Sequence, residues 1–137
     1  MRLDVYLNYA GNCEQAFRFY EQELGGRIST LMRHGDLPES RVPADWAKAI
    51  LHARLEIGNA TLMGADIPNA QPMRSAYVAL TVDSVEETER IYRVLSEGGE
   101  IFMKMEQTFF AKRFAMLRDR FGTSWMLLHG VQAEQGP

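Results

Sequence analysis

The spacing of hydrophobic and polar residues changes along the chain in the same order twice. Residues 3–9 have the composition of a strand, and residues 13–24 place apolar side chains at the three- and four-residue steps of a helical face. About 72 residues later, residues 75–82 and 85–95 repeat this strand and helix. Three more strand-like runs follow each helix. The pattern therefore predicts an α+β protein made of two βαβββ modules.

The remaining strands and connections complete each module. In the first half, Gly58-Asn59 is a tight-turn signal between two strands, and residues 34–48 carry two prolines and no period, which predicts a long loop. The expected organisation is a first module at 1–66, a linker at 67–74, a second module at 75–130 and a tail at 131–137. The further strands are expected at 28–33, 49–57, 61–64, 100–105, 111–118 and 124–129.

Both helices carry recognisable start signals. Asn12 with Gln15 predicts a capping box at the first helix, and Ser84 with Glu87 predicts a stronger one at the second. Gly25, just after the first helix, suits a left-handed ending. The expected buried faces are Cys13, Ala16, Tyr20 and Leu24 in the first helix and Val85, Thr88, Tyr92 and Leu95 in the second.

Composition narrows the classes of protein that the chain can belong to. Its 137 residues are 46% hydrophobic, which suffices for a packed core in one domain or two small halves. A net charge of −3 with a pI near 5.6 argues against nucleic-acid binding, and no apolar run has the length of a membrane span. The chain opens on a predicted strand without a signal-peptide pattern, and Cys13 is its single cysteine. We therefore expect a cytoplasmic protein without disulfides.

Five groups of residues within this repeated plan resemble one superfamily. The sequence is similar over nearly its whole length to the vicinal oxygen chelate proteins, which include glyoxalase I, bleomycin-resistance proteins and extradiol dioxygenases, and within them to the PhnB-like branch. The branch usually has Trp where Phe110 stands and Gly where Ala115 stands. The residues that carry the resemblance are Tyr6-Leu7 with Gly11-Asn12-Cys13-Glu14 and Ala16-Phe17; Phe19-Tyr20 with Leu24-Gly25-Gly26; Leu62-Met63-Gly64-Ala65-Asp66 with Pro68; Gln107-Thr108-Phe109-Phe110-Ala111; and Asp119-Arg120-Phe121-Gly122 with Trp125-Met126.

The resemblance implies a cup-shaped mixed sheet with the helices outside, and it implies where a metal would bind. Metal enzymes of the superfamily use His, Gln or Glu on the first and last strand of each module. Those positions fall here at Val5 or Tyr6, near Met63, at Tyr77 and at Met126. Thioether sulfur is soft and neutral and a phenol has a pKa near 10, so none of these side chains suits a divalent metal. No metal or other cofactor is therefore expected, although a displaced divalent-metal site stays open.

Other reactive side chains offer weak signals. The chain positions of His34, His52 and His129 give no reason for them to converge on a metal, so ordinary surface or strand-end histidines are favoured. Cys13 lies at a helix start, where the dipole lowers a thiol pKa, yet it also falls on the predicted apolar face, which favours a buried residue. Glu86, Glu87 and Glu89 indicate a solvated helix start. Although members of this branch often carry a methyltransferase label, the chain has no glycine-rich cofactor turn.

A ligand pocket is the favoured interpretation of the remaining aromatic and methionine residues, since apolar walls with a few polar tips are typical of small-molecule sites. The competing interpretation is that the same side chains close the cup as ordinary core. Glu106 and Gln107 precede an aromatic pair on a connection that, by resemblance, runs over the cup mouth. The candidate pocket residues are Tyr6, Met63, Tyr77, Glu106, Gln107, Phe110, Phe114, Trp125 and Met126.

Three functions remain open at this point. The first is binding of a small organic molecule in a metal-free cup. The second is metal-dependent chemistry of the lyase, isomerase or dioxygenase type at a displaced site, for example one using His52 or Glu106. The third is a non-catalytic role in which a filled cup serves a dimer. The resemblance also implies a homodimer.

Overall fold

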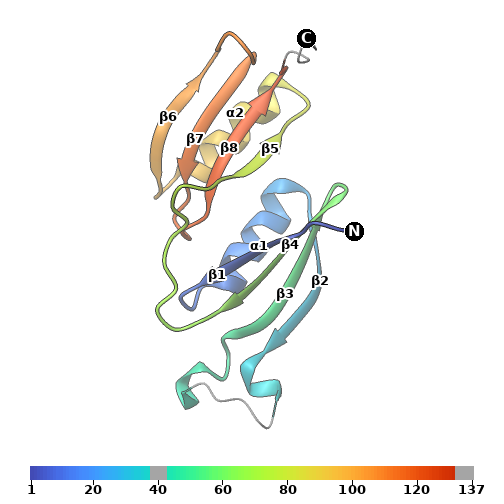
Figure 1. Cartoon of the computed structure of the whole chain (residues 1–137), viewed down its shortest axis with the longest axis vertical. Coiled ribbons are helices and arrows are strands. Elements are labelled where there is room, and N and C mark those ends of the chain that lie inside the picture. Colours follow the sequence, from blue (N-terminus) through green and yellow to red (C-terminus); the bar gives the residue numbers. More distant parts are fainter. Residues whose placement is uncertain (38–42, 132–137) are drawn as a thin grey trace. The chain divides into compact units, whose positions relative to one another are not determined.

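The protein forms two compact units, Met1–Gln71 and Pro72–Pro137. The structure is a computed structural model, and it describes residues 1–37 and 43–131. The boundary between the units falls inside the predicted linker. Each unit consists of one four-stranded mixed sheet with one helix packed on one of its faces (Figure 1). This arrangement confirms the predicted α+β fold of two βαβββ modules.

The first unit contains β1 (Val5–Tyr9), α1 (Cys13–Leu24), β2 (Arg27–Arg33), β3 (Ile50–Ile57) and β4 (Ala60–Asp66). The strand order is β1-β4-β3-β2, in which β1 and β4 are parallel and the other neighbours antiparallel. The segment predicted as a loop between β2 and β3 contains two short 3-10 helices, His34–Asp36 and Ala44–Trp46. Its residues 38–42 lie outside the described part of the chain.

The second unit repeats the first with β5 (Val78–Thr81), α2 (Val85–Ser96), β6 (Glu100–Glu106), β7 (Arg113–Arg118) and β8 (Ser124–His129). Its strand order, β5-β8-β7-β6, is the same topology (Figure 1). Two strands of this unit, β5 and β7, begin later than predicted. The backbone before β5 has a left-handed residue at Ser75, and a turn closed by Thr108 and Ala111 precedes β7. Most of the predicted tail, residues 132–137, is outside the described residues.

The core of the first unit lies between α1 and its sheet. Cys13, Ala16, Phe17 and Tyr20 are the buried residues of α1, so the predicted face is confirmed except that Leu24 is half-buried and Phe17 takes part. Gly64 in β4 makes this packing possible, because a Cβ there would lie 2.8 Å from Phe17 Cζ. A residue without a side chain is thus required where the Phe17 ring packs against β4.

The cap of α1 corrects the sequence-based prediction. Asn12 makes no side-chain capping bond, so the predicted box with Gln15 does not form. Instead, Asp66 at the end of β4 accepts hydrogen bonds from the backbone N–H groups of Gly11 and Cys13, at 3.0 and 2.9 Å. A carboxylate at this position satisfies free donors and also interacts favourably with the helix dipole. The first helix is therefore fixed to the sheet by a residue far away in sequence.

The second helix follows its prediction more closely. Ser84 accepts a hydrogen bond from the backbone N–H of Glu87, as a capping residue should. The Glu87 carboxylate, which a capping box would turn back to Ser84, instead binds Arg90 with both oxygens. The buried residues are Thr88, Ile91 and Leu95, whereas Val85 and Tyr92 are half-buried. Within the described residues, no helix is long and apolar enough to cross a membrane.

Candidate ligand-binding faces

Each sheet has one face covered by its helix and one face without a helix, which we call the open face. Side chains alternate between the two faces along a strand. In β1, Leu7 and Tyr9 are buried and Tyr6 and Asn8 are exposed, so Tyr6 lies on the open face. Val5 shares the helix-facing side with Leu7. Of the two positions predicted for the first metal ligand of the superfamily, Tyr6 is therefore the one on the open face.

Register places the predicted residues of the first unit side by side. Met63 lies directly opposite Tyr6 on β1 and opposite Arg54 on β3. His52, two residues before Arg54, is on the same face and pairs with Met32 of β2. Tyr6 Oη is 3.1 Å from His52 Nδ1, and the two rings stack with centroids 5.7 Å apart. This pair was not predicted, because its members are separated by 46 residues and no local pattern links them.

A polar network covers the other end of this open face. Glu56 is 3.6 Å from Arg54 Nε, and it accepts hydrogen bonds from the hydroxyl groups of Ser29 and Thr61. The hydrogen bond from Ser29 is the main cause that lowers the pKa of Glu56. Arg2 donates a further hydrogen bond to Thr61, at 2.9 Å. Arg54 pairs with Glu56 and Arg2 pairs with Asp4, so the charges of this network are paired rather than isolated.

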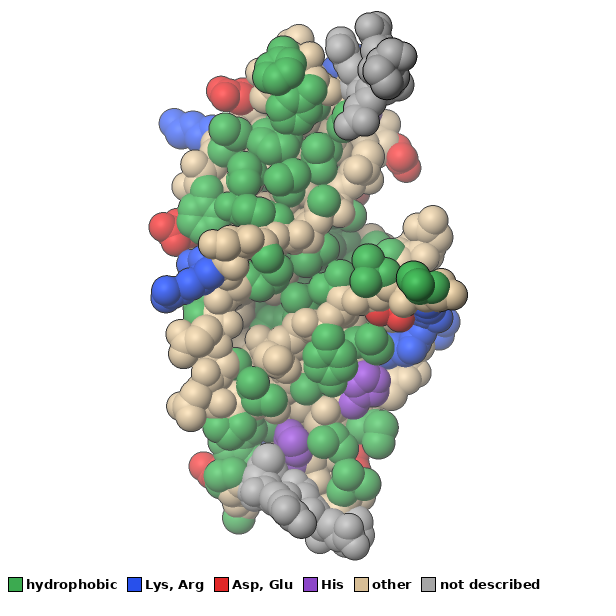
Figure 2. All heavy atoms as spheres, viewed as in Figure 1, with side chains coloured by type: hydrophobic (Ala, Val, Ile, Leu, Met, Phe, Trp, Pro, Cys, Tyr) green, Lys and Arg blue, Asp and Glu red, His purple; other side chains and the backbone are tan. Residues whose placement is uncertain are grey.

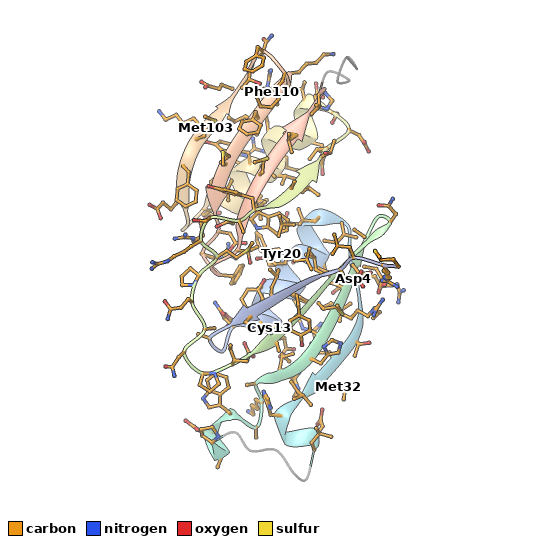
Figure 3. The ribbon with its side chains drawn as sticks, viewed as in Figure 1. Asp4, Cys13, Tyr20, Met32, Met103 and Phe110 are labelled. Carbon is orange, nitrogen blue, oxygen red and sulfur yellow. The ribbon has the colours of Figure 1, made fainter. Side chains whose placement is uncertain are left out.

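The open face of the second unit is apolar instead. Met126 on β8 lies opposite Met116 on β7, and Met116 lies opposite Met103 on β6, so three thioethers form a row across the sheet. Met103 is 41% exposed and is labelled in Figure 3, together with Phe110. Figure 2 shows hydrophobic side chains gathered on the surface of this unit. Met116 and Met126 are half-buried, so the row is partly exposed. Exposed apolar side chains that gather on one face can mark a binding site.

Aromatic rings extend this apolar face at both ends. The Phe110 ring is 5.0 Å from that of Phe114, which faces Leu128 across the sheet. At the other end, Tyr77 makes an edge contact with Phe102 at 6.4 Å, and the Arg118 guanidinium lies 5.3 Å above the same Phe102 ring. Each contact is within the range of a favourable aromatic or cation–π interaction.

Five predicted pocket residues of the second unit lie at different places in the sheet. Met126 is on the open face, but its partner on β5 is Ala79, so Tyr77 lies two residues before the position directly opposite Met126. Glu106 and Gln107 are exposed at the end of β6. Trp125 is a correction: it is 1% exposed, faces the helix side, and donates from Nε1 to Asp119 Oδ2 at 2.9 Å. Trp125 is a core residue, because its polar atom is satisfied inside the unit.

The histidines do not gather at one site. His34 is buried, with Nε2 3.3 Å from the Asp66 carbonyl oxygen, which differs from the surface position predicted for it. His129 Nδ1 is 2.7 Å from the Val82 carbonyl oxygen in the second unit. Over residues 1–37 and 43–131, no three His, Cys, Asp or Glu side chains lie close enough together to hold a metal ion.

Cys13 is a buried residue of the first core, as its apolar position predicted. The thiol is 0% exposed. Burial raises its pKa far above the usual range, and the nearby carboxylates of Asp66 and Glu14 raise it further. A thiol in this environment stays protonated and is a poor nucleophile. The alternative of a reactive cysteine is therefore wrong.

A groove of about 610 Å³ lies at the N-terminal end of α1. Its polar wall includes Glu14, which binds Arg33 through both carboxylate oxygens at 2.7 and 3.0 Å and also binds Arg18. The hydrogen bond from Arg33 lowers the pKa of Glu14 to about 2. Sequence reasoning did not locate this groove; the signal for it was the long segment 34–48, which supplies Trp46 and Lys48.

Comparison with known proteins identifies the family that these two units represent. The model of the Glyoxalase/Bleomycin resistance protein/Dioxygenase superfamily matches residues 2–127. The chain belongs to this superfamily. It is 32% identical to Protein YjdN of Escherichia coli K12 over 139 aligned positions, covering 93% of this chain and 94% of that protein. The resemblance predicted from the sequence is thereby confirmed.

Solved structures agree with this assignment. Protein PA1353 from Pseudomonas aeruginosa is 40% identical, with a TM-score of 0.85 over 94% of this chain and 97% of that one. A PhnB protein from Bacillus cereus has a TM-score of 0.81 at 23% identity, over 94% and 99% of the two chains. The second likeness concerns the fold alone. Together these comparisons agree with the superfamily that the family model identifies.

Proposed function

We propose that this protein binds a small organic molecule on the open faces of its sheets, without a metal ion. The observation that carries the proposal is the partly exposed methionine and aromatic surface of the second unit, centred on Met103, Met116 and Met126. Thioether side chains are flexible and polarisable, so they adapt to apolar ligands of different shape. The side chains predicted at the superfamily's metal positions, which are Val5 or Tyr6, Met63, Tyr77 and Met126, support binding without a divalent metal because none of them suits one.

We further propose that the protein acts as a cytoplasmic homodimer. Large apolar side chains remain exposed on the second unit, including Phe102 at 43% and Phe109 at 90%. Surfaces of this kind are stabilised when a ligand or another protein surface covers them. Sedimentation of the purified chain tests the dimer, and a concentration-independent monomer would contradict it.

Metal content is the first test of the proposed function. Mass spectrometry of the purified protein, before and after addition of zinc, nickel, manganese or iron, should find well below one equivalent of bound metal. A stoichiometric metal would instead favour a superfamily enzyme whose ligands lie at a displaced site, and it would refute the metal-free proposal.

Ligand binding is tested with the neutral fluorescent dye N-phenyl-1-naphthylamine. Fluorescence should rise saturably with the native protein, and the dye should raise Tm, because a compound that binds only the folded state stabilises it by about 2.7 kcal/mol at 100 times its Kd. Two neighbouring residues of β6 provide a matched pair of variants. Met103 is on the open face, opposite Met116, whereas Ile101 is 44% exposed but lies opposite the buried Leu117.

We expect Met103→Gln to weaken dye binding and Ile101→Gln to leave it unchanged. Both substitutions replace a similarly exposed apolar side chain by Gln, and they differ in the face of the sheet that they alter. Equal effects of the two variants would show that the dye does not bind the open face. No saturable binding to the unmodified protein would contradict the proposed function itself.

A further inference from the structure

The hydrogen-bonded pair of Tyr6 and His52 is the most distinctive polar feature of the first open face. The two side chains come from β1 and β3, and they meet above β4, which lies between those strands. The hydroxyl–imidazole distance is 3.1 Å, and the ring planes are inclined by only 21°. Each ring therefore restricts the orientation of the other.

Stability of the fold does not explain this pair. Tyr6 is 47% exposed and points away from α1, whereas its neighbours Leu7 and Tyr9 are buried against the helix. A hydrogen bond that solvent can reach contributes little to folding, because water replaces either partner. The pair instead holds an imidazole in a fixed position on an accessible surface.

The direction of this hydrogen bond and the tautomer of the imidazole are linked. Partial desolvation raises the pKa of the Tyr6 phenol, so the hydroxyl keeps its proton at neutral pH and can donate it. In the arrangement where His52 Nδ1 accepts this hydrogen bond, the imidazole carries its hydrogen at Nε2. Nε2 of His52 makes no hydrogen bond to another protein group within residues 1–37 and 43–131. It is a donor available to a ligand.

The surroundings of this donor suit an unsaturated ring. Met32, 39% exposed, is the register partner of His52, and Met63 is the register partner of Tyr6. The charged side chains that follow on the same face of β3 are Arg54 and Glu56, which lie 3.6 Å from each other. The donor is therefore bordered by soft apolar side chains on two strands, with a cation two residues away.

We propose that His52 Nε2–H, oriented by Tyr6, binds a carboxylate or phenolate oxygen of a small aromatic molecule. The ring of this molecule lies against Met32 and Met63. The inference rests on the proposed function and adds the chemical class of the ligand and the residue that recognises its oxygen. Tyr6 acts here as a positioning residue, since its hydroxyl is used by the imidazole.

The full chain with ¹⁵N-labelled histidine provides the test, with benzoate as the probe and toluene as the analogue that lacks the oxygens. We expect the His52 ring to show the Nε2–H tautomer, and its signals to shift saturably with benzoate but not with toluene. Affinity for so small a probe should be on the order of millimolar.

Four variants separate recognition from folding. His52→Leu should weaken benzoate binding about tenfold or more, because the donor is lost. His52→Gln should retain part of the affinity, since its amide nitrogen can donate. Tyr6→Phe should give a mixture of imidazole tautomers and bind several-fold more weakly. His129→Gln, in the second unit, is the matched control and should bind benzoate as the unmodified chain does.

The outcomes distinguish this inference from the proposed function. If benzoate leaves the His52 signals unmoved, or if His52→Leu binds benzoate normally, the inference is wrong, and dye binding on the second unit still stands. If neither benzoate nor N-phenyl-1-naphthylamine binds, both proposals fail together. A His52 ring that carries its hydrogen on Nδ1 would also overturn the inference.

Discussion

Replacing Asp66 should lower the stability of the first unit by more than a substitution at its surface does. This carboxylate is 1% exposed, and it accepts three backbone hydrogen bonds. Oδ1 binds the N–H groups of Gly11 and Cys13, and Oδ2 binds the N–H of Ile50 at 2.8 Å. One side chain thus connects the start of α1, the start of β3 and the end of β4.

The magnitude follows from the donors that a substitution leaves without partners. In Asp66→Ala all three N–H groups lose the carboxylate, and each unsatisfied buried donor costs about 1–3 kcal/mol. Because water can enter near the helix start, the lower part of this range applies, and we expect a loss of about 4 kcal/mol. That is a large share of the roughly 5–15 kcal/mol available to a small protein. Asp66→Asn should cost less, since its amide oxygen can still accept from two donors.

Urea unfolding followed by circular dichroism measures the loss, and hydrogen exchange locates it. Amides of α1 and β3 should exchange much faster in the variant, while those of the second unit, including β7 and β8, change little. Asp83→Asn is the matched control: Asp83 is exposed just before α2, and its replacement should change stability by less than about 0.5 kcal/mol. A loss below about 1 kcal/mol for Asp66→Ala, with α1 protection intact, would refute this account of the cap.

Two further changes test the packing and the charges of the same unit. Gly64→Ala should cost about 1–3 kcal/mol in urea unfolding, because the new methyl group would overlap the Phe17 ring; Phe17→Leu in the same chain should recover part of that loss, and simple additivity would argue against the overlap. The pKa of Glu14 is about 2 in the folded chain, so its stabilising effect is complete above the ordinary carboxyl pKa of about 4.5 and is lost as the pH falls toward 2. Glu14→Gln should therefore lower Tm at pH 7 by a small amount, corresponding to less than about 1 kcal/mol for a partly exposed group, and the difference from the unmodified chain should vanish near pH 2. A difference in Tm that persists there would exclude the carboxylate as its source.

Local patterns in the sequence were sufficient to predict the helices and strands and their order along the chain. Both helices were expected from apolar spacing and end residues, and the structure begins them at Cys13 and Val85, as predicted. Contacts between residues that are far apart in the sequence could not be predicted. The predicted cap at Asn12 is replaced by Asp66, which lies three strands further along the chain, at the end of β4. A residue that suits a local motif can be displaced by a charged partner that the fold brings closer.

The candidate site was harder to predict because strand register decides which face a residue occupies. A shift of one residue exchanges the two faces, so Val5 and Tyr6 could not be separated by counting. Trp125 was assigned to the pocket for the same reason. The structure places it on the helix-covered face of the sheet, where its ring nitrogen donates a hydrogen bond to Asp119. The contact between Tyr6 and His52 depends on two strands that are not adjacent in the sheet, and no sequence spacing could indicate it.

The repeated topology helps to separate structural from functional residues. Both units use the same strand order, and both place their large buried side chains between one helix and one sheet. A residue type that the topology demanded on the open face should therefore occur in both units. The open faces differ instead: the first presents the Tyr6–His52 pair and a charged network, and the second presents a row of methionines. The common fold requires neither of these groups of side chains on an open face. Selection for the molecule that binds each face is therefore the simpler explanation of the difference. This argument directs mutagenesis to His52 and Met103, where a change should alter binding and leave the shared framework in place.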